Sequence, residues 1–281
     1  MALDSLRRQD LEEPFEVIVV DSGRDGCGAF VARCYPEVHV VRSETRLWPA
    51  GARNRGIDAS RGRYVAFLPD DCAARPDWLR RRLAVHRQGV EAVGGAVTNG
   101  TPRSVIGTAS YLLEYAAVMP SMSVLERQGV PHGLSFARGV FARVGRYPED
   151  MEMGEDTVFN RRCLAEGVRV AFDPEIAIEH RNPTRLRPFL AHQFGHGRGL
   201  VRCSLEYGIY PGLAAALRRG GLHAALELFV RYPLGRFAAE TRCVARGRPD
   251  WLPRLAILSP LVAAGVLATA VGAWSEWRSP G

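Results

Sequence analysis

Lysine is absent from this chain of 281 residues, so all 37 basic residues are arginine, and the formal net charge is +7. Arginine forms paired hydrogen bonds with phosphates and carboxylates, so a basic chain of this kind suits a phosphorylated substrate, an anionic membrane surface or nucleic acid. The sequence also lacks any helix-turn-helix, zinc-finger or aromatic RNA-binding pattern. We therefore expect no nucleic-acid partner.

Paired cysteines are absent as well. The six cysteines are scattered along the chain, and no two of them form a Cys-x-x-Cys motif. This spacing argues against a zinc site built from cysteines and against a secreted disulfide framework. A reducing, cytosolic setting is the simplest interpretation for the main domain.

Charge is absent from residues 255–274, a run of 20 positions. A run of that length can cross a bilayer, and the arginines that flank its amino side predict that the preceding domain faces the cytoplasm. The alternative is a packed helix, because Pro260 and several small residues lower the hydropathy of the run. Residues 222–239 combine apolar and charged positions, which predicts an amphipathic helix lying at the membrane interface.

The chain does contain apolar, β-branched runs that alternate with helical segments. This alternation predicts an α/β, Rossmann-like fold, in which a mostly parallel central sheet carries helices on both faces and further helices follow at the carboxyl end. From residue 188 onward the pattern is helical and rich in arginine. We expect strands at residues 15–20, 38–42, 64–68, 92–97, 134–136, 168–172 and 176–179, and helices at residues 28–34, 51–59, 78–87, 110–118, 138–144 and 157–165.

Two adjacent carboxylates, Asp70 and Asp71, follow the apolar run at residues 64–68. Neighbouring carboxylates repel each other unless a cation lies beside them, and hard ions such as Mg²⁺ or Mn²⁺ prefer oxygen ligands. Sheets of α/β proteins usually bind ligands at the carboxyl ends of their strands, so the pair predicts a metal–diphosphate site. The plainer alternative is that Asp70 caps the helix that begins near Trp78.

Three further segments accompany this pair. The residues Val20-Asp21-Ser22-Gly23 end a strand, residues 52–56 are Ala-Arg-Asn-Arg-Gly, and residues 154–156 are Gly-Glu-Asp. In this order the four segments resemble the motifs of the family 2 glycosyltransferases, the inverting enzymes of the GT-A fold. The resemblance covers residues 3 to about 200. It implies transfer of a sugar from a nucleotide-diphosphate donor by a hexosyltransferase type of enzyme, with Mg²⁺ or Mn²⁺ as cofactor.

The resemblance also implies a role for each matching residue. Asp71 would bind the metal directly, and Asp70 would face the ribose or a metal-bound water. Asp21 would hydrogen-bond the base or ribose of the nucleotide, and Arg53 and Asn54 would donate to the nucleotide or its diphosphate. The plainer alternatives are a turn-forming aspartate, a surface arginine and a helix-capping asparagine.

Further residues complete the implied site. Asp156 would be the general base that takes the proton of the acceptor hydroxyl, and the charge of Glu155 beside it would raise its pKa. Helix capping by both acids is the alternative. His180 resembles a family position that approaches the metal or diphosphate. Residues 193–202 resemble a Gln-Phe-x-x-Gly-Arg-Gly stretch of membrane-associated members that build exopolysaccharides, and we expect transfer of single sugars.

Members of this family begin with a further strand that carries a Pro-Thr-Tyr-Asn-like segment. This sequence begins within the helix expected after that strand, so we expect the strand to be missing. We expect a GT-A domain over residues 1–200, an amphipathic membrane-proximal region over residues 201–250, and a transmembrane helix with its tail over residues 251–281. The catalytic domain would lie on the cytoplasmic side of the cell membrane, with a glycan or lipid-linked acceptor. The alternative is a non-catalytic membrane scaffold on a decayed glycosyltransferase fold.

Overall fold

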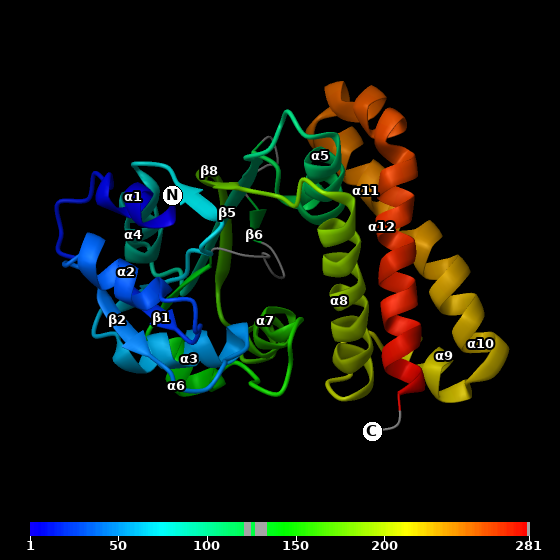
Figure 1. Cartoon of the computed structure of the whole chain (residues 1–281), viewed down its shortest axis with the longest axis horizontal. Coiled ribbons are helices and arrows are strands. Elements are labelled where there is room, and N and C mark those ends of the chain that lie inside the picture. Colours follow the sequence, from blue (N-terminus) through cyan, green and yellow to red (C-terminus); the bar gives the residue numbers. More distant parts are fainter. Residues whose placement is uncertain (121–124, 127–133, 280–281) are drawn as a thin grey trace. The chain divides into compact units, whose positions relative to one another are not determined.

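The structure is a computed structural model that describes residues 1–120, 125–126 and 134–279. Contacts divide the chain into two units that interleave along the sequence. Unit 1 comprises residues 1–96 and 124–178, and unit 2 comprises residues 97–123 and 179–281 (Figure 1). The sequence predicted regions at residues 1–200, 201–250 and 251–281 from their expected functions. A division by contacts does not test such boundaries, so they stay a prediction.

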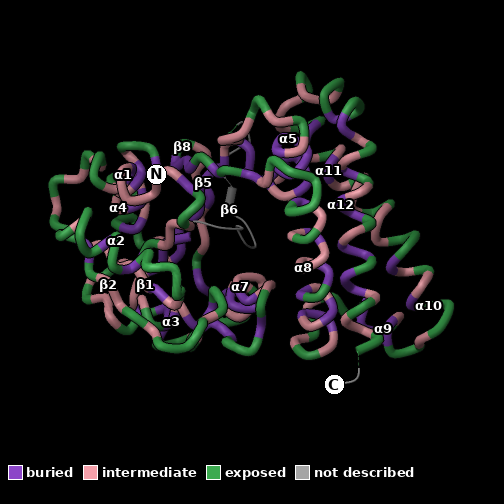
Figure 2. Tube along the Cα trace, in the orientation of Figure 1, coloured by how far each residue is buried: buried purple, intermediate pink, exposed green. Residues whose placement is uncertain are grey.

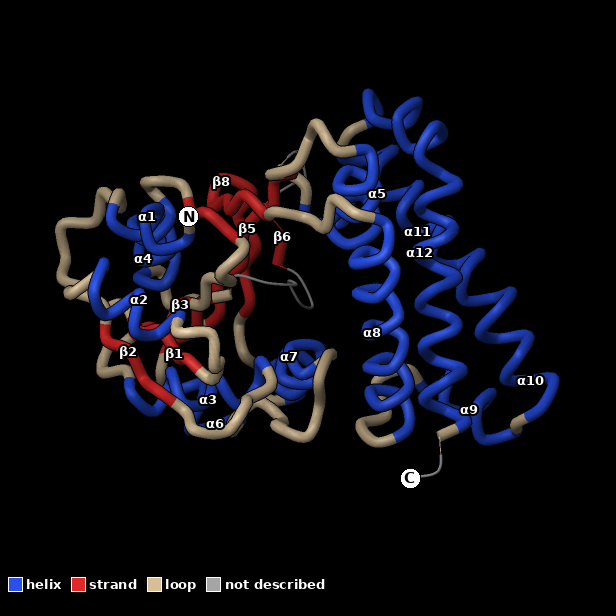
Figure 3. The backbone as a smooth tube through the Cα atoms, in the orientation of Figure 1, coloured by secondary structure: helices blue, strands red, loops and turns tan. Residues whose placement is uncertain are grey.

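The strands form two sheets (Figure 3). β1 (Ile18–Asp21) and β2 (His39–Arg42) pair in parallel, with Asp21 opposite Arg42 at the end of the ladder. Strands β3 and β5 of the second sheet both run antiparallel to β7, so they share one direction. The α/β class is thus confirmed, and its central sheet is mixed. The second sheet has the order β3 (Tyr64–Ala66), β7 (Ser135–Ala137), β5 (Ala92–Asn99), β8 (Val170–His180) and β4 (Cys72–Ala74), and β6 (Leu125–Glu126) pairs with β8.

The helices of unit 1 follow the expected alternation closely. One expectation about the strands is wrong. The two strands expected at residues 168–172 and 176–179 form one strand, β8, which begins at Val170. The φ of Pro174 fits extended backbone, and Glu175 N donates to Asp173 Oδ1 across it. The short strand β4, which follows the aspartate pair, was not expected. The helices are α1 (Ala2–Arg7), α2 (Cys27–Cys34), α3 (Pro49–Ala59), α4 (Trp78–Arg87), α6 (Gly139–Val144) and α7 (Glu155–Ala165).

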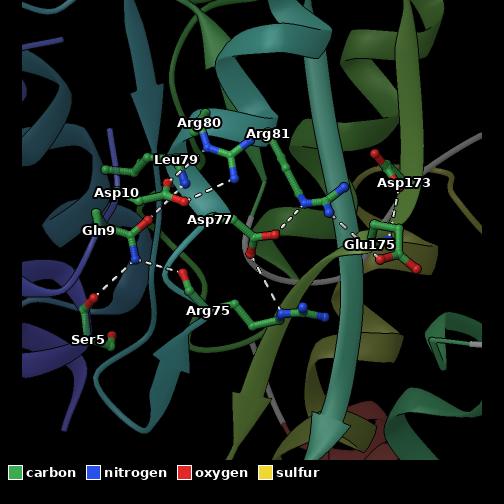
Figure 4. A network of polar contacts seen from close by, with 10 residues as sticks. All are labelled: Ser5, Gln9, Asp10, Arg75, Asp77, Leu79, Arg80, Arg81, Asp173 and Glu175. Atoms are coloured by element: carbon green, nitrogen blue, oxygen red, sulfur yellow. Dashed lines mark hydrogen bonds and ion pairs between the residues drawn. The ribbon is translucent and has the colours of Figure 1, made fainter. Parts of the chain in front are cut away.

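A polar network ties the amino-terminal helix α1 to the rest of unit 1 (Figure 4). The side chain of Gln9 donates to the carbonyl of Arg75 at 2.7 Å and accepts from the backbone N–H of Leu79 at 2.9 Å. The guanidinium of Arg80 donates twice to Asp10, at 3.1 and 3.0 Å. These bonds fix the chain ahead of β1 against the start of α4.

Unit 2 is helical beyond the ends of β5 and β8 (Figure 3). The expected amphipathic helix at residues 222–239 is divided in the structure, since a π-helical turn at Glu227–Arg231 separates α10 from α11. The expected helix at 110–118 begins earlier, at Val105. The helices are α5 (Val105–Tyr115), α8 (Leu186–Leu205), α9 (Pro211–Arg219), α10 (Gly221–Leu226), α11 (Tyr232–Gly247) and α12 (Leu252–Arg278).

Helices α8 and α12 pack side by side through glycines (Figure 1). A Cβ atom added at Gly197 of α8 would lie 2.0 Å from the carbonyl oxygen of Thr269, and one added at Gly272 of α12 would lie 2.0 Å from that of Phe194. No real Cβ atom approaches another atom so closely, so both positions require glycine. The two backbones therefore touch directly.

The helical segment Pro249–Arg278, which contains α12, is long and apolar enough to cross a membrane, with a mean hydropathy of 2.1 over its best window. Within that window, 44% of the residues are buried inside the protein, and Figure 2 shows buried positions recurring along α12. Its other face exposes large apolar side chains, such as Ile257 at 78% and Val271 at 49%. One face of α12 therefore packs inside the protein, as the alternative to a membrane span expected. The prediction that the helix crosses a membrane depends on its other, exposed apolar face.

Candidate functional site

Asp21 ends strand β1 and organises the loop that leads to α2. Its Oδ1 accepts the N–H of Gly23 at 2.9 Å, and its Oδ2 accepts the N–H of Gly28 at 3.0 Å. A Cβ at position 28 would lie 2.2 Å from Oδ2, so only glycine allows this approach. Arg42 lies 3.8 Å from the same oxygen. The turn-forming role of Asp21 is thus present, and its contact with a nucleotide stays a prediction.

Asp70 and Asp71 lie exposed in the connection from β3 to β4. Burial and the charge of Asp71, followed by that of Asp70, raise the pKa of the Cys72 thiol. Burial and the charges of Asp25, Asp21 and Asp70 likewise raise the pKa of Cys27 at the start of α2. Both thiols thus experience negative charge from this region. The carboxylates of β1 and of the β3–β4 connection therefore share one neighbourhood of unit 1.

Arg53 of α3 and Glu155 of α7 form a buried ion pair between segments 102 residues apart. The guanidinium of Arg53 also stacks over the ring of Tyr147 at 5.3 Å. The side chain of Glu155 is 7% exposed. Burial and the charge of Asp156 raise the pKa of Glu155, and Arg53 opposes that shift. The pair joins the Arg-Asn segment to the Glu-Asp segment, a contact that the sequence alone did not predict.

Asn54 fixes the acidic loop that precedes α7. Its Nδ2 donates to the carbonyl of Tyr147 at 2.9 Å and to Glu149 at 2.7 Å, and its Oδ1 accepts from Tyr147 N at 3.0 Å. Asn54 is 5% exposed and lies inside α3, so it does not cap that helix. Tyr147 and Glu149 were missed by the sequence analysis. The contact of Asn54 with the nucleotide donor stays a prediction.

Asp156 lies in the first turn of α7, after Gly154, whose φ of 94° favours glycine. Its Oδ1 accepts the N–H of Thr157 at 2.7 Å, and the side chain is partly exposed. The amino end of a helix stabilises a carboxylate. Asp156 is thus positioned beside the Arg53–Glu155 pair and can reach solvent. Its role as base, like the catalytic role of Glu155, stays a prediction.

His180 ends β8 and belongs to unit 2, where Asn182 orients it. The Nδ1 of His180 lies 3.0 Å from Asn182 Oδ1, and Asn182 Nδ2 donates to Asn99 Oδ1 at 3.0 Å. An amide oxygen only accepts, so in the neutral imidazole the proton sits on Nδ1 and the lone pair on Nε2. That tautomer suits a metal ligand. Asn182 was missed, although it stands two residues after the predicted histidine.

The structure thus gathers seven of the eight predicted residues in unit 1 and puts His180 in unit 2. The exposed carboxylates at positions 70 and 71 are oxygen donors of the kind that Mg²⁺ and Mn²⁺ prefer. A separate apolar groove of about 660 Å³ in unit 2 contains none of the predicted site residues. It is lined by Leu186, Arg187, Leu190, Ala191, Phe194, Ala268 and Val271.

The chain is similar in sequence to known glycosyltransferases. The family model described as Glycosyl transferase family 2 matches residues 1–137. The chain is 28% identical over 198 residues to the glycosyltransferase AglE of Haloferax volcanii, an alignment covering 67% of this chain and 63% of that protein. It is 32% identical over 179 residues to the succinoglycan biosynthesis protein ExoO of Rhizobium meliloti, covering 57% and 50%.

One solved structure with a similar fold is the mannosyltransferase PcManGT from Pyrobaculum calidifontis, in complex with GDP-Man and Mn²⁺. It aligns with a TM-score of 0.58 at 22% identity, over 97% of this chain and 81% of that chain. The likeness confirms the expected GT-A fold. The chain spans 63% of the length of AglE and 50% of that of ExoO.

Proposed function

We propose that this chain, a member of the glycosyltransferase family 2 through its residues 1–137, transfers a sugar from a nucleoside-diphosphate donor with inversion at the anomeric carbon. The observation that carries this proposal is the buried contact between Arg53 and Glu155, which joins two motif segments and leaves Asp156 partly exposed beside them. The similar structure that holds GDP-Man and Mn²⁺ supports the donor class.

In this proposal Asp71 binds Mg²⁺ or Mn²⁺ directly, and Asp70 faces the ribose or a metal-bound water. A bound divalent ion neutralises the negative charge of a departing diphosphate. Asp21, Arg53 and Asn54 orient the nucleotide. The loop bonds of Asn54 and Asp21 keep these groups fixed before the donor arrives, which lowers the entropy cost of reaching the reactive geometry.

Asp156 acts on the acceptor. The acceptor hydroxyl oxygen forms a bond to the anomeric carbon on the face opposite the diphosphate, the bond from that carbon to the diphosphate oxygen breaks, and the hydroxyl proton passes to the Asp156 carboxylate. Attack from the opposite face inverts the configuration. The ion pair with Glu155 holds Arg53 next to the Asp156 carboxylate. A catalytic role of Glu155 is part of the same proposal.

Unit 2 associates with the cytoplasmic face of the cell membrane, where a lipid-linked or glycan acceptor of the exopolysaccharide type would be met. The exposed apolar side chains of unit 2 support this membrane association. Among the described residues, three large apolar side chains of unit 1 are exposed, namely Phe15, Phe30 and Trp48, against eleven of unit 2. The most exposed of these eleven are Leu222 at 81%, Ile257 at 78% and Leu234 at 68%.

Two aspartate variants test the transfer reaction. Asp156→Asn should spare donor binding and lower turnover by about 10²–10⁴-fold, the usual contribution of a general base. Asp71→Asn should weaken metal-dependent donor binding. Asp58→Asn, an exposed aspartate of α3, is the matched control. Turnover that is unchanged in both site variants would defeat the assignment.

Vesicle flotation tests membrane association. Leu222→Asp and Leu234→Asp should release the chain from anionic vesicles, because each exposed leucine would lose about 1.5–3 kcal/mol of burial. Phe30→Asp in unit 1 should leave flotation unchanged. If the control variant releases the chain as strongly as the two leucine variants do, unit 2 is not the membrane-binding part.

A further inference from the structure

Two histidines of α8 and one glutamate of α5 bring their ligand atoms together inside unit 2. His192 and His196 stand four residues apart on one helix face, and their Nε2 atoms are 3.1 Å apart. Glu114 Oε1 lies 3.5 Å from His192 Nε2. The three ligand atoms all lie within 4.8 Å of one another. The proposed transfer reaction uses none of these residues.

The separations match those of ligands around one small ion. Two atoms that bind a tetrahedral ion at about 2.0–2.1 Å lie about 3.3–3.4 Å apart. The observed values of 3.1 and 3.5 Å stand on either side of that distance. The two imidazole planes meet at 89°, so the rings are not stacked. Both rings can therefore turn a nitrogen toward a shared centre.

Supporting hydrogen bonds orient the glutamate. Glu114 Oε1 accepts from Ser110 Oγ at 3.1 Å and from Gln193 Nε2 at 2.7 Å. Ser110 and Gln193 are 0% and 3% exposed. The hydroxyl of Thr269 on α12 in turn bonds Gln193 Oε1 at 3.4 Å. Buried groups that hold a ligating carboxylate in this way are typical of metal sites.

The surroundings favour a cation that enters from solvent. The side chain of Glu114 is 10% exposed, whereas that of His192 is 35% exposed. The side of the cluster that His192 occupies is therefore open to solvent, whereas Glu114 is covered by the protein.

We propose that Glu114, His192 and His196 bind a divalent transition-metal ion of the Zn²⁺ type, which fastens α5 to α8. Two imidazoles and one carboxylate are a donor set that Zn²⁺ accepts with a water in the fourth position. Imidazole ligands distinguish this site from one for Mg²⁺, which prefers oxygen donors. The competing explanation for the 3.1 Å contact is an N–H···N hydrogen bond between the two histidines.

Calorimetric titration of the full chain with Zn²⁺, in excess Mg²⁺, tests the proposal. We expect one zinc ion per chain. His192→Gln and His196→Gln should each weaken its binding by at least about 10–100-fold, the loss caused by removing even a supporting bond. The matched control is His223→Gln, which changes an exposed histidine of α10 and should leave zinc affinity unchanged. Zinc affinity that stays unchanged in both site variants would overturn the proposal.

X-ray absorption at the zinc edge of the wild-type chain gives an answer that needs no variant. The account predicts a nitrogen and oxygen shell that includes imidazole. A sulfur shell would place the zinc on cysteines such as the exposed Cys27 or Cys34 and would overturn the proposal. An absence of bound zinc after dialysis would leave the histidines as a hydrogen-bonded pair and would overturn it as well.

Discussion

Unit 1 and unit 2 differ in the groups that they leave exposed. Among its described residues unit 1 exposes only three large apolar side chains, and it exposes the carboxylates of Asp70 and Asp71 between β3 and β4. Unit 2 exposes most of the large apolar side chains among the described residues, including Leu222 and Leu234. The first surface suits a polar, phosphorylated ligand together with a cation. The second suits a lipid surface.

Each unit also contains a buried acid that faces an arginine. The Glu155 side chain in unit 1 and the Glu240 side chain in unit 2 are each 7% exposed, and their partners are Arg53 and Arg236. Arg53 is 22% exposed and Arg236 is 39% exposed. The two pairs thus allow a direct comparison of a buried acid facing a mostly covered arginine with one facing an exposed arginine.

Replacing each arginine should give the largest difference between the two units in the free energy of unfolding. Arg53→Met leaves Glu155 as a buried, uncompensated charge, which costs about 3–5 kcal/mol. Arg236→Met should cost less, because Arg236 is more exposed than Arg53 and water already screens its contact with Glu240. Urea unfolding at pH 7 measures both losses. An equal loss in the two variants would contradict the distinction.

The pH dependence of stability should have opposite signs in the two units. Burial lowers the pKa of His86 in unit 1 from 6.5 to about 4, so the unfolded chain binds a proton that the folded unit does not, and stability falls as pH drops through this range. Burial raises the pKa of Glu240 in unit 2 from 4.5 to about 7, so the folded unit binds the extra proton, and stability falls as pH rises through that range.

Each effect amounts to roughly 3 kcal/mol at most, since one pKa unit corresponds to about 1.4 kcal/mol. Hydrogen exchange followed by mass spectrometry at pH 5 and pH 7.5 would resolve the units separately. Glu240→Gln should abolish the trend in unit 2 and leave that in unit 1. The same trend in both units would contradict the account.

The contact between α8 and α12 gives a smaller effect confined to unit 2. Gly197→Ala should destabilise the unit by about 1–3 kcal/mol, because the new methyl group meets the Thr269 carbonyl. Gly235→Ala is the matched control, since nothing lies within 4 Å of its added Cβ, and it should stabilise α11 by about 0.5–1 kcal/mol. Thermal unfolding of both variants would decide. A neutral Gly197→Ala would show that the helices are not in direct contact.

The sequence predicted unit 1 better than unit 2. Strand ends such as Asp21 and the pair at Asp70 are local patterns, so their positions could be predicted from spacing alone. The contact of Arg53 with Glu155 spans 102 residues and depends on how α3 meets α7, which no local pattern encodes. In unit 2 the side chain of Gln193 donates to Glu114 on another helix, whereas the sequence analysis placed this glutamine only in a Gln-Phe-x-x-Gly-Arg-Gly stretch.

The most direct test of the central claim is calorimetric binding of a nucleoside diphosphate, UDP or GDP, to the wild-type chain and to Asp71→Asn, each with and without Mn²⁺. The account predicts that wild-type binding depends on Mn²⁺ and that this dependence disappears in the variant. Nucleotide binding that is as tight without the ion, or that keeps its dependence on Mn²⁺ in Asp71→Asn, would contradict it.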